Sequence, residues 1–165
     1  MLDWSTGQRE HPVAIRLPGG EMISDGRTVT KQFGALNTYE VTARGSRVAL
    51  LGLGTFYPLA QEAAERVARQ TGVRPTVINP YYISGIDAEL LEELKRDHQV
   101  VATLEDGVLD GGFGEKIARF YGSSEMKVLN FGLKKEFLDR YDVEEVLRAN
   151  RLTTEQVADD VCALL

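Results

Sequence analysis

Four apolar runs of strand length alternate with helical segments between residues 47 and 165, and this alternation constrains the fold most. The runs are 47–54 (RVALLGLG), 76–83, 99–105 and 126–132. Near-continuous apolar runs are typical of strands buried on both faces of a parallel sheet. Strands that alternate with helices pair in parallel through right-handed crossovers. We therefore expect an α/β fold, a three-layer α/β/α sandwich with a mostly parallel sheet.

Local signals add detail to this sandwich. Segment 39–45 (YEVTARG) is joined to 47–54 by a short Gly-Ser turn, so we expect one antiparallel strand at an edge and 47–54 at the centre. Residues that favour helix starts predict where the helices begin: Thr55, Asp87, Asp142 and Thr153. The last two belong to capping boxes, with Glu145 and Gln156 as their partners.

Residues 1–17 are predicted to be the end of a preceding part of a longer chain. Residues 1–17 indicate the end of a helix, a turn and a strand over 12–17, with no earlier segment to pair with that strand. We expect the natural chain to begin upstream. Residues 18–38, rich in Gly, Thr and Asp, are expected to be a linker, and 39–165 to be one domain.

Composition excludes several classes of protein. A hydrophobic content of 43% and a charged content of 27% are typical of a soluble globular protein. The net charge of −6 argues against a nucleic-acid partner. No apolar run approaches the roughly 18–20 residues that a membrane span needs. A single cysteine and the lack of a signal peptide favour a cytoplasmic protein.

Two glycine-rich turns are candidate ligand sites. In 52–58 (GLGTFYP) Tyr57 stands where a dinucleotide fingerprint needs its third glycine, so a tight structural turn is favoured. In 103–122 (TLEDGVLDGGFGEKIARFYG) a calcium loop fails, because Val108 and Ile117 fall at ligand positions. A phosphate cradle there lacks its Gly-Lys-Ser/Thr ending. We favour a structural turn whose carboxylates suit a helix N-terminus.

The individual residues that could carry chemistry indicate no further functional site with certainty of role. His11 and His98 belong to no ligand cluster, and Cys162 has no nearby base, so structural roles are favoured for all three. Arg16 closes the predicted strand beside a Gly-Gly pair, where an anion site and a surface ion pair are equally plausible. No residues of this chain form a complete catalytic, cofactor-binding or metal site.

Four stretches carry a resemblance over almost the whole chain: 11–20 (HPVAIRLPGG), 77–94 (VINPYYISGIDAELLEEL), 100–120 (VVATLEDGVLDGGFGEKIARF) and 128–147 (VLNFGLKKEFLDRYDVEEVL). In this order they resemble the C-terminal transketolase-like domain of the 1-deoxy-D-xylulose-5-phosphate synthase family. The resemblance implies that 1–17 is the tail of a pyrimidine-binding domain, 18–38 a linker and 39–165 the C-terminal domain.

The same resemblance implies a function. Such enzymes condense pyruvate with glyceraldehyde 3-phosphate, using thiamine diphosphate and Mg²⁺ held by domains that precede this one. We therefore expect this chain alone to bind neither and to be inactive, to serve as a scaffold, and to form a homodimer. Two alternatives stay open: another transketolase-like enzyme or a 2-oxoacid dehydrogenase beta subunit, and a stand-alone binding module.

The chain departs from the family where substrate is held. Arg16 is kept and is expected to bind the acceptor phosphate, but Gly19 stands in place of a second arginine. Tyr81 and Ser84 replace an arginine and a lysine, and Gly85 replaces a proline. These losses indicate a divergent branch whose acceptor substrate is open.

Overall fold

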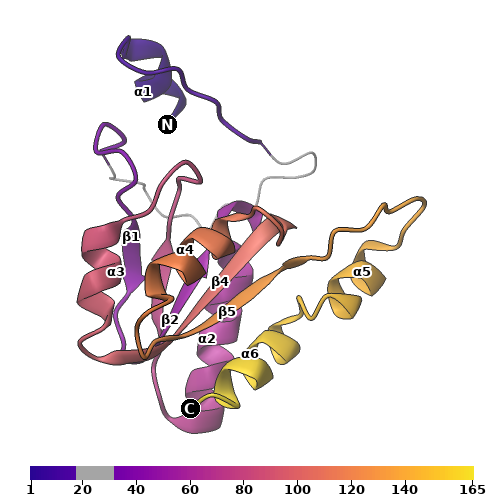
Figure 1. Cartoon of the computed structure of the whole chain (residues 1–165). Coiled ribbons are helices and arrows are strands. Elements are labelled where there is room, and N and C mark those ends of the chain that lie inside the picture. Colours follow the sequence, from indigo (N-terminus) through magenta and orange to yellow (C-terminus); the bar gives the residue numbers. More distant parts are fainter. Residues whose placement is uncertain (18–31) are drawn as a thin grey trace. The chain divides into compact units, whose positions relative to one another are not determined.

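The computed structural model describes residues 1–17 and 32–165, which belong to two compact units, 1–36 and 37–165. Most of the predicted linker 18–38, including Gly19, lies outside the described residues. Figure 1 shows the helices and strands of both units.

The described residues of the first unit, 1–17 and 32–36, include one short helix, α1 (Leu2–Gly7). The ring of Trp4 packs against that of Phe33, with centroids 6.5 Å apart. The prediction of a strand over 12–17 was wrong, since these residues adopt no regular structure. An apolar pattern alone does not make a strand, because its backbone groups need a neighbouring strand. All five strands among the described residues belong to the sheet of the second unit.

The second unit is built on one five-stranded sheet in the order β1-β3-β2-β4-β5. The strands are β1 (Glu40–Ala43), β2 (Arg47–Gly52), β3 (Thr76–Asn79), β4 (His98–Val108) and β5 (Lys127–Leu133). All neighbours pair in parallel except β1 and β3, which pair antiparallel. The predictions of a central 47–54 strand and an antiparallel strand at the edge are confirmed.

The partner of β1 is β3 and not β2, the next strand in sequence. The β1–β2 connection therefore crosses the start of β3. There the Gly45 N–H donates to Thr76 Oγ1 at 3.0 Å and the Ser46 N–H donates to the Arg74 carbonyl at 3.0 Å. A Cβ atom on residue 45 would lie 1.9 Å from the Arg74 carbonyl oxygen, so this crossing requires glycine.

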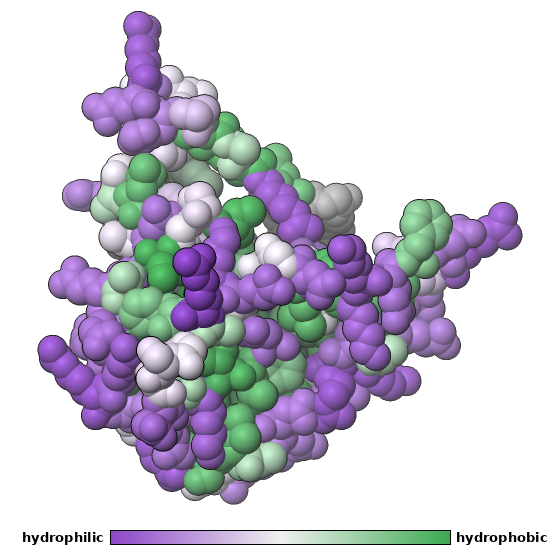
Figure 2. Space-filling model, in the orientation of Figure 1, coloured by the Kyte–Doolittle hydropathy of each residue, from purple (hydrophilic) through white to green (hydrophobic). Residues whose placement is uncertain are grey.

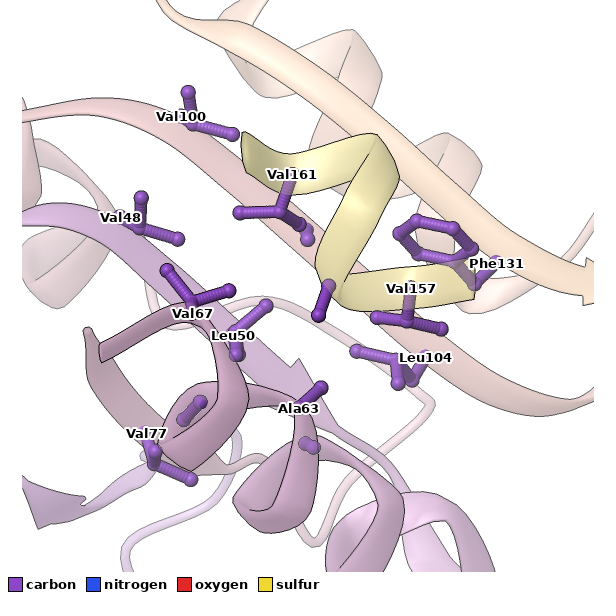
Figure 3. Packing of buried hydrophobic residues seen from close by; sticks show 14 of the residues in the cluster. Val48, Leu50, Ala63, Val67, Val77, Val100, Leu104, Phe131, Val157 and Val161 are labelled. Atoms are coloured by element: carbon purple, nitrogen blue, oxygen red, sulfur yellow. The ribbon is translucent and has the colours of Figure 1, made fainter. Parts of the chain in front are cut away.

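Helices cover both faces of the sheet (Figure 1). On one face α2 (Tyr57–Thr71) and α6 (Thr154–Cys162) pack on Val48 and Leu50 of β2. On the other face α3 (Ala88–Leu94) and α4 (Phe113–Tyr121) share a cluster with Ala49 and Leu51. Figure 3 shows the first cluster, in which side chains of α2 and α6 meet those of β2, β4 and β5. Burial on both faces explains why β2 is a continuous apolar run.

Three of the four predicted helix starts are capped as expected. The side chains of Asp87, Asp142 and Thr153 accept hydrogen bonds from the backbone N–H three residues on, at the starts of α3, α5 (Val143–Ala149) and α6. The prediction for Thr55 was wrong. A short 3₁₀ turn, η1 (Gly54–Phe56), precedes α2, and the Thr55 hydroxyl donates to Asp106 Oδ2 at 3.1 Å instead. In the described part of the chain, no helix combines the length and apolar character that a membrane span requires.

Candidate functional site

The carboxyl ends of the parallel strands are where ligands bind in sheets of this kind. Four parallel strands end at this edge, and three of the segments there contain the candidate turns: η1 after β2, the loop 80–86 after β3, and the glycine-rich turn at the end of β4, which includes Glu105. The described residues of all three segments belong to the second unit. Their contacts decide whether this edge is open to a ligand.

Glu105 organises the glycine-rich turn. Its side chain is buried, and its two carboxylate oxygens accept hydrogen bonds from the N–H groups of Phe113 and Gly114, both at 2.8 Å. These amides open α4, where a helix exposes unpaired donors and a partial positive charge. A bound phosphate would need the same donors. The carboxylate of Glu105 therefore occupies the position at the helix start where a phosphate group would have to bind.

The glycines of this turn allow the close approach. A Cβ on residue 112 would lie 2.6 Å from Glu105 Oε2, and one on residue 114 would lie 2.6 Å from Thr103 Oγ1. Gly111 has a φ of 73°, which other residues rarely adopt. These contacts favour the structural turn that was predicted over 103–122. Among the residues that the structure describes, no three His, Cys, Asp or Glu side chains gather as a metal site would need.

The turn at 52–58 is also structural. A Cβ on Gly52 would lie 2.6 Å from the Cα of Tyr57, and Gly54 has a φ of 60°. Gly52 permits the close approach of Tyr57, and Gly54 supplies the positive φ, so both glycines serve the reversal of the chain from β2 into α2. The prediction of a tight strand-to-helix turn is confirmed.

The divergent loop 80–86 is fastened to the beginning of β1. The Tyr81 hydroxyl donates to Glu40 Oε2 at 2.5 Å, and the Ser84 hydroxyl donates to Asn37 Oδ1 at 3.0 Å. A Cβ on Gly85 would lie 2.6 Å from the Asn37 side chain, so a larger residue there would displace it. Tyr81, Ser84 and Gly85, three of the residues at which this chain departs from the family pattern, thus lie in contacts within the domain.

His98 has the structural role expected for it. Its Nδ1 lies 3.2 Å from the Leu94 carbonyl at the end of α3 and 2.6 Å from Asp97 Oδ1, while Nε2 lies 2.8 Å from Thr76 Oγ1. Both ring nitrogens are therefore engaged with the protein. Such a ring stabilises the helix end and offers no position for a ligand.

Cys162 is not activated. Its thiol donates to Gln70 Oε1 at 3.1 Å, and burial, followed by the charge of Asp159, raises the pKa of the Cys162 thiol. A nucleophilic cysteine needs a lowered pKa. The contacts favour the structural role predicted from the sequence.

Arg16 and His11 belong to the first unit, whereas the strand ends belong to the second. Both side chains are exposed. Arg16 is the one substrate residue predicted from the sequence, and its role in binding the acceptor phosphate stays a prediction.

One functional feature was missed from the sequence, namely the part played by Glu105. The available signal was a carboxylate that ends an apolar strand eight residues before a helix start. Because Asp106 and Asp110 are also acidic and lie close in sequence, the sequence did not show which of the three carboxylates would contact the helix start.

The chain belongs to the transketolase C-terminal domain family, whose model matches residues 37–157. Its relatives point to one enzyme of that class. It is 35% identical over 156 residues to a 1-deoxy-D-xylulose-5-phosphate synthase of Symbiobacterium thermophilum, covering 93% of this chain and 24% of the relative. The synthase of Clostridium beijerinckii is 30% identical over 166 residues, covering 99% and 26%. The chain thus spans about a quarter of the length of the curated relatives it matches.

A solved structure shows the same fold. A split gene transketolase, described as an inactive beta4 tetramer, superposes with a TM-score of 0.68 at 26% identity, covering 78% of this chain and 41% of the other. The resemblance inferred from the four sequence stretches, and the α/β sandwich expected from the periodicity, are both confirmed.

Proposed function

We propose that this chain is the C-terminal part of a cytoplasmic, thiamine-diphosphate-dependent 1-deoxy-D-xylulose-5-phosphate synthase, which joins pyruvate to glyceraldehyde 3-phosphate for isoprenoid synthesis. The observation that carries the proposal is the match of 93% of the chain to synthases of this name. Residues 1–17 would be the tail of a pyrimidine-binding domain, 18–38 the linker and 39–165 the C-terminal domain.

The role of the domain in that enzyme is to be a scaffold. The strand ends, where a ligand would sit, are occupied by contacts within the domain: Glu105 on the start of α4, Thr55 on Asp106, and Tyr81 on Glu40. The described residues do not fit thiamine diphosphate, because the glycine-rich helix start is already capped by a carboxylate. The cofactor and its Mg²⁺ would be held by preceding thiamine-binding domains, the main partners of this one.

We further propose that the chain pairs with a second copy of itself. The similar split gene transketolase is described as a tetramer of one kind of chain. That assembly supports self-association of a chain that carries this domain, because most soluble oligomers consist of identical subunits.

The purified chain alone should not turn over pyruvate and glyceraldehyde 3-phosphate, because its described residues offer no thiamine or metal site. The same residues in an enzyme that also contains the thiamine-binding domains should form 1-deoxyxylulose 5-phosphate, measured by following pyruvate consumption and product mass. Turnover by the chain alone would overturn the scaffold role. An enzyme with intact thiamine binding but no product from these two substrates would overturn the proposed synthase.

Substitution of Arg16 by alanine in that complete enzyme should raise the KM for the phosphorylated acceptor by about tenfold or more. A guanidinium holds phosphate oxygens through charge-assisted hydrogen bonds of about 1.5–3 kcal/mol each. The KM for pyruvate should hardly change. Arg9→Ala, which removes another exposed arginine of the first unit, is the matched control. Equal losses for both substrates would mark Arg16 as a structural residue.

A second candidate, another transketolase-like enzyme that takes a ketose phosphate as its donor, is favoured by the match to the split gene transketolase. The two candidates differ in the substrate that the complete enzyme accepts. Product formed from a ketose phosphate donor, and not from pyruvate, would favour the second.

A further inference from the structure

The loop 80–86 lies between β3 and α3 and buries little of its own surface. Residues 81–86 are all exposed or half-buried, and Ile86 at the end of the loop packs, half-buried, against the cluster under α3 and α4. On the face of the molecule that Figure 2 shows, hydrophobic residues are likewise interspersed with many hydrophilic ones. Segments with few buried apolar contacts are those that open locally while the rest of a domain stays folded.

Two hydrogen bonds at opposite ends of the loop hold it on a neighbouring segment. We name residues 37–40 the strap; they begin the second unit, and Glu40 pairs with the last residue of β3. The Tyr81 hydroxyl donates to Glu40 at 2.5 Å, and the Ser84 hydroxyl donates to Asn37 at 3.0 Å. The strap is therefore the seat on which the loop rests.

Tyr39 fixes the strap to the core and is itself covered by the loop. Its side chain is buried, and its ring lies 6.1 Å from that of Phe113, measured between centroids. Its N–H donates to Asp87 Oδ2 at 2.8 Å, which ties the strap to the cap of α3. Its hydroxyl donates to the Gly85 carbonyl of the loop at 3.3 Å. A movement of the loop away from the strap would therefore uncover this hydroxyl.

The closed position of the loop has a conformational cost. Tyr81 has a φ of 60°, in the left-handed region that a bulky side chain rarely adopts. Such a conformation persists where surrounding contacts hold it, and it is often found at segments that switch between two states. Lys116 of α4 also donates to the Ile83 carbonyl, but this lysine is exposed and its contact is open to competition from water.

We propose that the loop 80–86 is a lid, closed on the strap in this structure, which opens as one unit. Opening breaks the contacts of Tyr81, Ser84 and Gly85 with the strap together and releases the left-handed conformation of Tyr81. It uncovers the Tyr39 hydroxyl at the carboxyl end of β3. The ligand-binding edge of the sheet, which contacts within the domain fill in the closed state, thus has a second state with polar groups open to solvent.

Removal of either hydrogen bond tests whether the lid opens as one unit. Tyr81→Phe and Ser84→Ala should each raise the hydrogen-exchange rate of the amides throughout 82–86 by the same factor, about fivefold for the loss of one hydrogen bond. The Leu50 amide in the core of the sheet should exchange as in the wild type. Tyr141→Phe, which removes the hydroxyl of an exposed tyrosine outside the lid, is the matched control and should have no effect. A rise confined to the neighbours of the substituted residue, no rise, or an equal rise at Leu50 would overturn the proposal.

Chemical labelling tests what the lid covers. Burial raises the pKa of the Tyr39 phenol, so Tyr39 should react slowly with tetranitromethane, which attacks the phenolate. In Ser84→Ala, which keeps every tyrosine, nitration of Tyr39 should accelerate by the factor seen for the lid amides. The exposed Tyr141 is the internal reference and should react at the same rate in both proteins. Unchanged nitration of Tyr39 beside faster exchange of the lid would refute the claim that opening uncovers this hydroxyl.

Discussion

Substitution of Gly45 by alanine is expected to lower the free energy of unfolding of the sandwich by about 3 kcal/mol or more. The new methyl group would lie 1.9 Å from the Arg74 carbonyl oxygen and 2.6 Å from the carbonyl carbon and oxygen of Pro75. These are backbone atoms, which cannot rotate away as a side chain can. Relief requires the β1–β2 connection to move off the start of β3. Urea denaturation, followed by circular dichroism, measures the loss.

Gly122→Ala is the matched control for this substitution. It adds the same methyl group at a glycine in an ordinary helical conformation, where the nearest atoms are at 3.4 Å and 3.6 Å. A change within about 0.5 kcal/mol is expected there. Equal stability of the Gly45→Ala and wild-type proteins would show that the connection does not pass so close to β3.

The layers of the fold could be predicted because they depend on local patterns. The run 47–54 is apolar at every buried position, so it predicted a strand covered on both faces, and β2 is covered on both faces. The pairing of β1 with β3 could not be predicted, because a Gly-Ser turn fits both a hairpin and a crossing. Contacts distant in sequence decide it, among them the bond from the Gly45 N–H to Thr76 Oγ1.

The two wrong predictions also depend on contacts between residues distant in sequence. The pattern at 12–17 suits a strand, but a strand forms only where another offers hydrogen bonds. Thr55 has the right side chain for a helix cap, yet Asp106 from the end of β4 lies within reach and binds its hydroxyl. A cap is a local preference of about 1 kcal/mol, and one tertiary hydrogen bond is enough to override it.

The glycine-rich turn shows that residue types alone do not identify the kind of site they form. Glycines and carboxylates before a helix suit a metal, a phosphate or a structural turn, and counting positions excluded only the metal loop. The choice between the other two depends on which group meets the helix N-terminus. The structure places Glu105 there, whereas the sequence indicated only that one of the carboxylates of the turn would suit the helix N-terminus.

Substitution of Glu105 by alanine is therefore expected to lower the free energy of unfolding by about 3 kcal/mol. The change leaves the N–H groups of Phe113 and Gly114 without their acceptor in a buried place, and each charge-assisted bond is worth about 1.5–3 kcal/mol. Glu105→Gln keeps the size and one acceptor oxygen but loses the charge that favours a helix N-terminus, so its loss should be smaller.

Hydrogen exchange separates this local role from a general loss of stability. In Glu105→Ala the amides of Phe113 and Gly114 should exchange faster than the global change in stability explains, because their acceptor is gone. Asp110→Ala, which removes an exposed carboxylate from the same turn, should change neither stability nor exchange appreciably. If Asp110→Ala proved as harmful as Glu105→Ala, the stabilising effect would come from the turn's general negative charge near the helix, and the specific cap by Glu105 would be refuted.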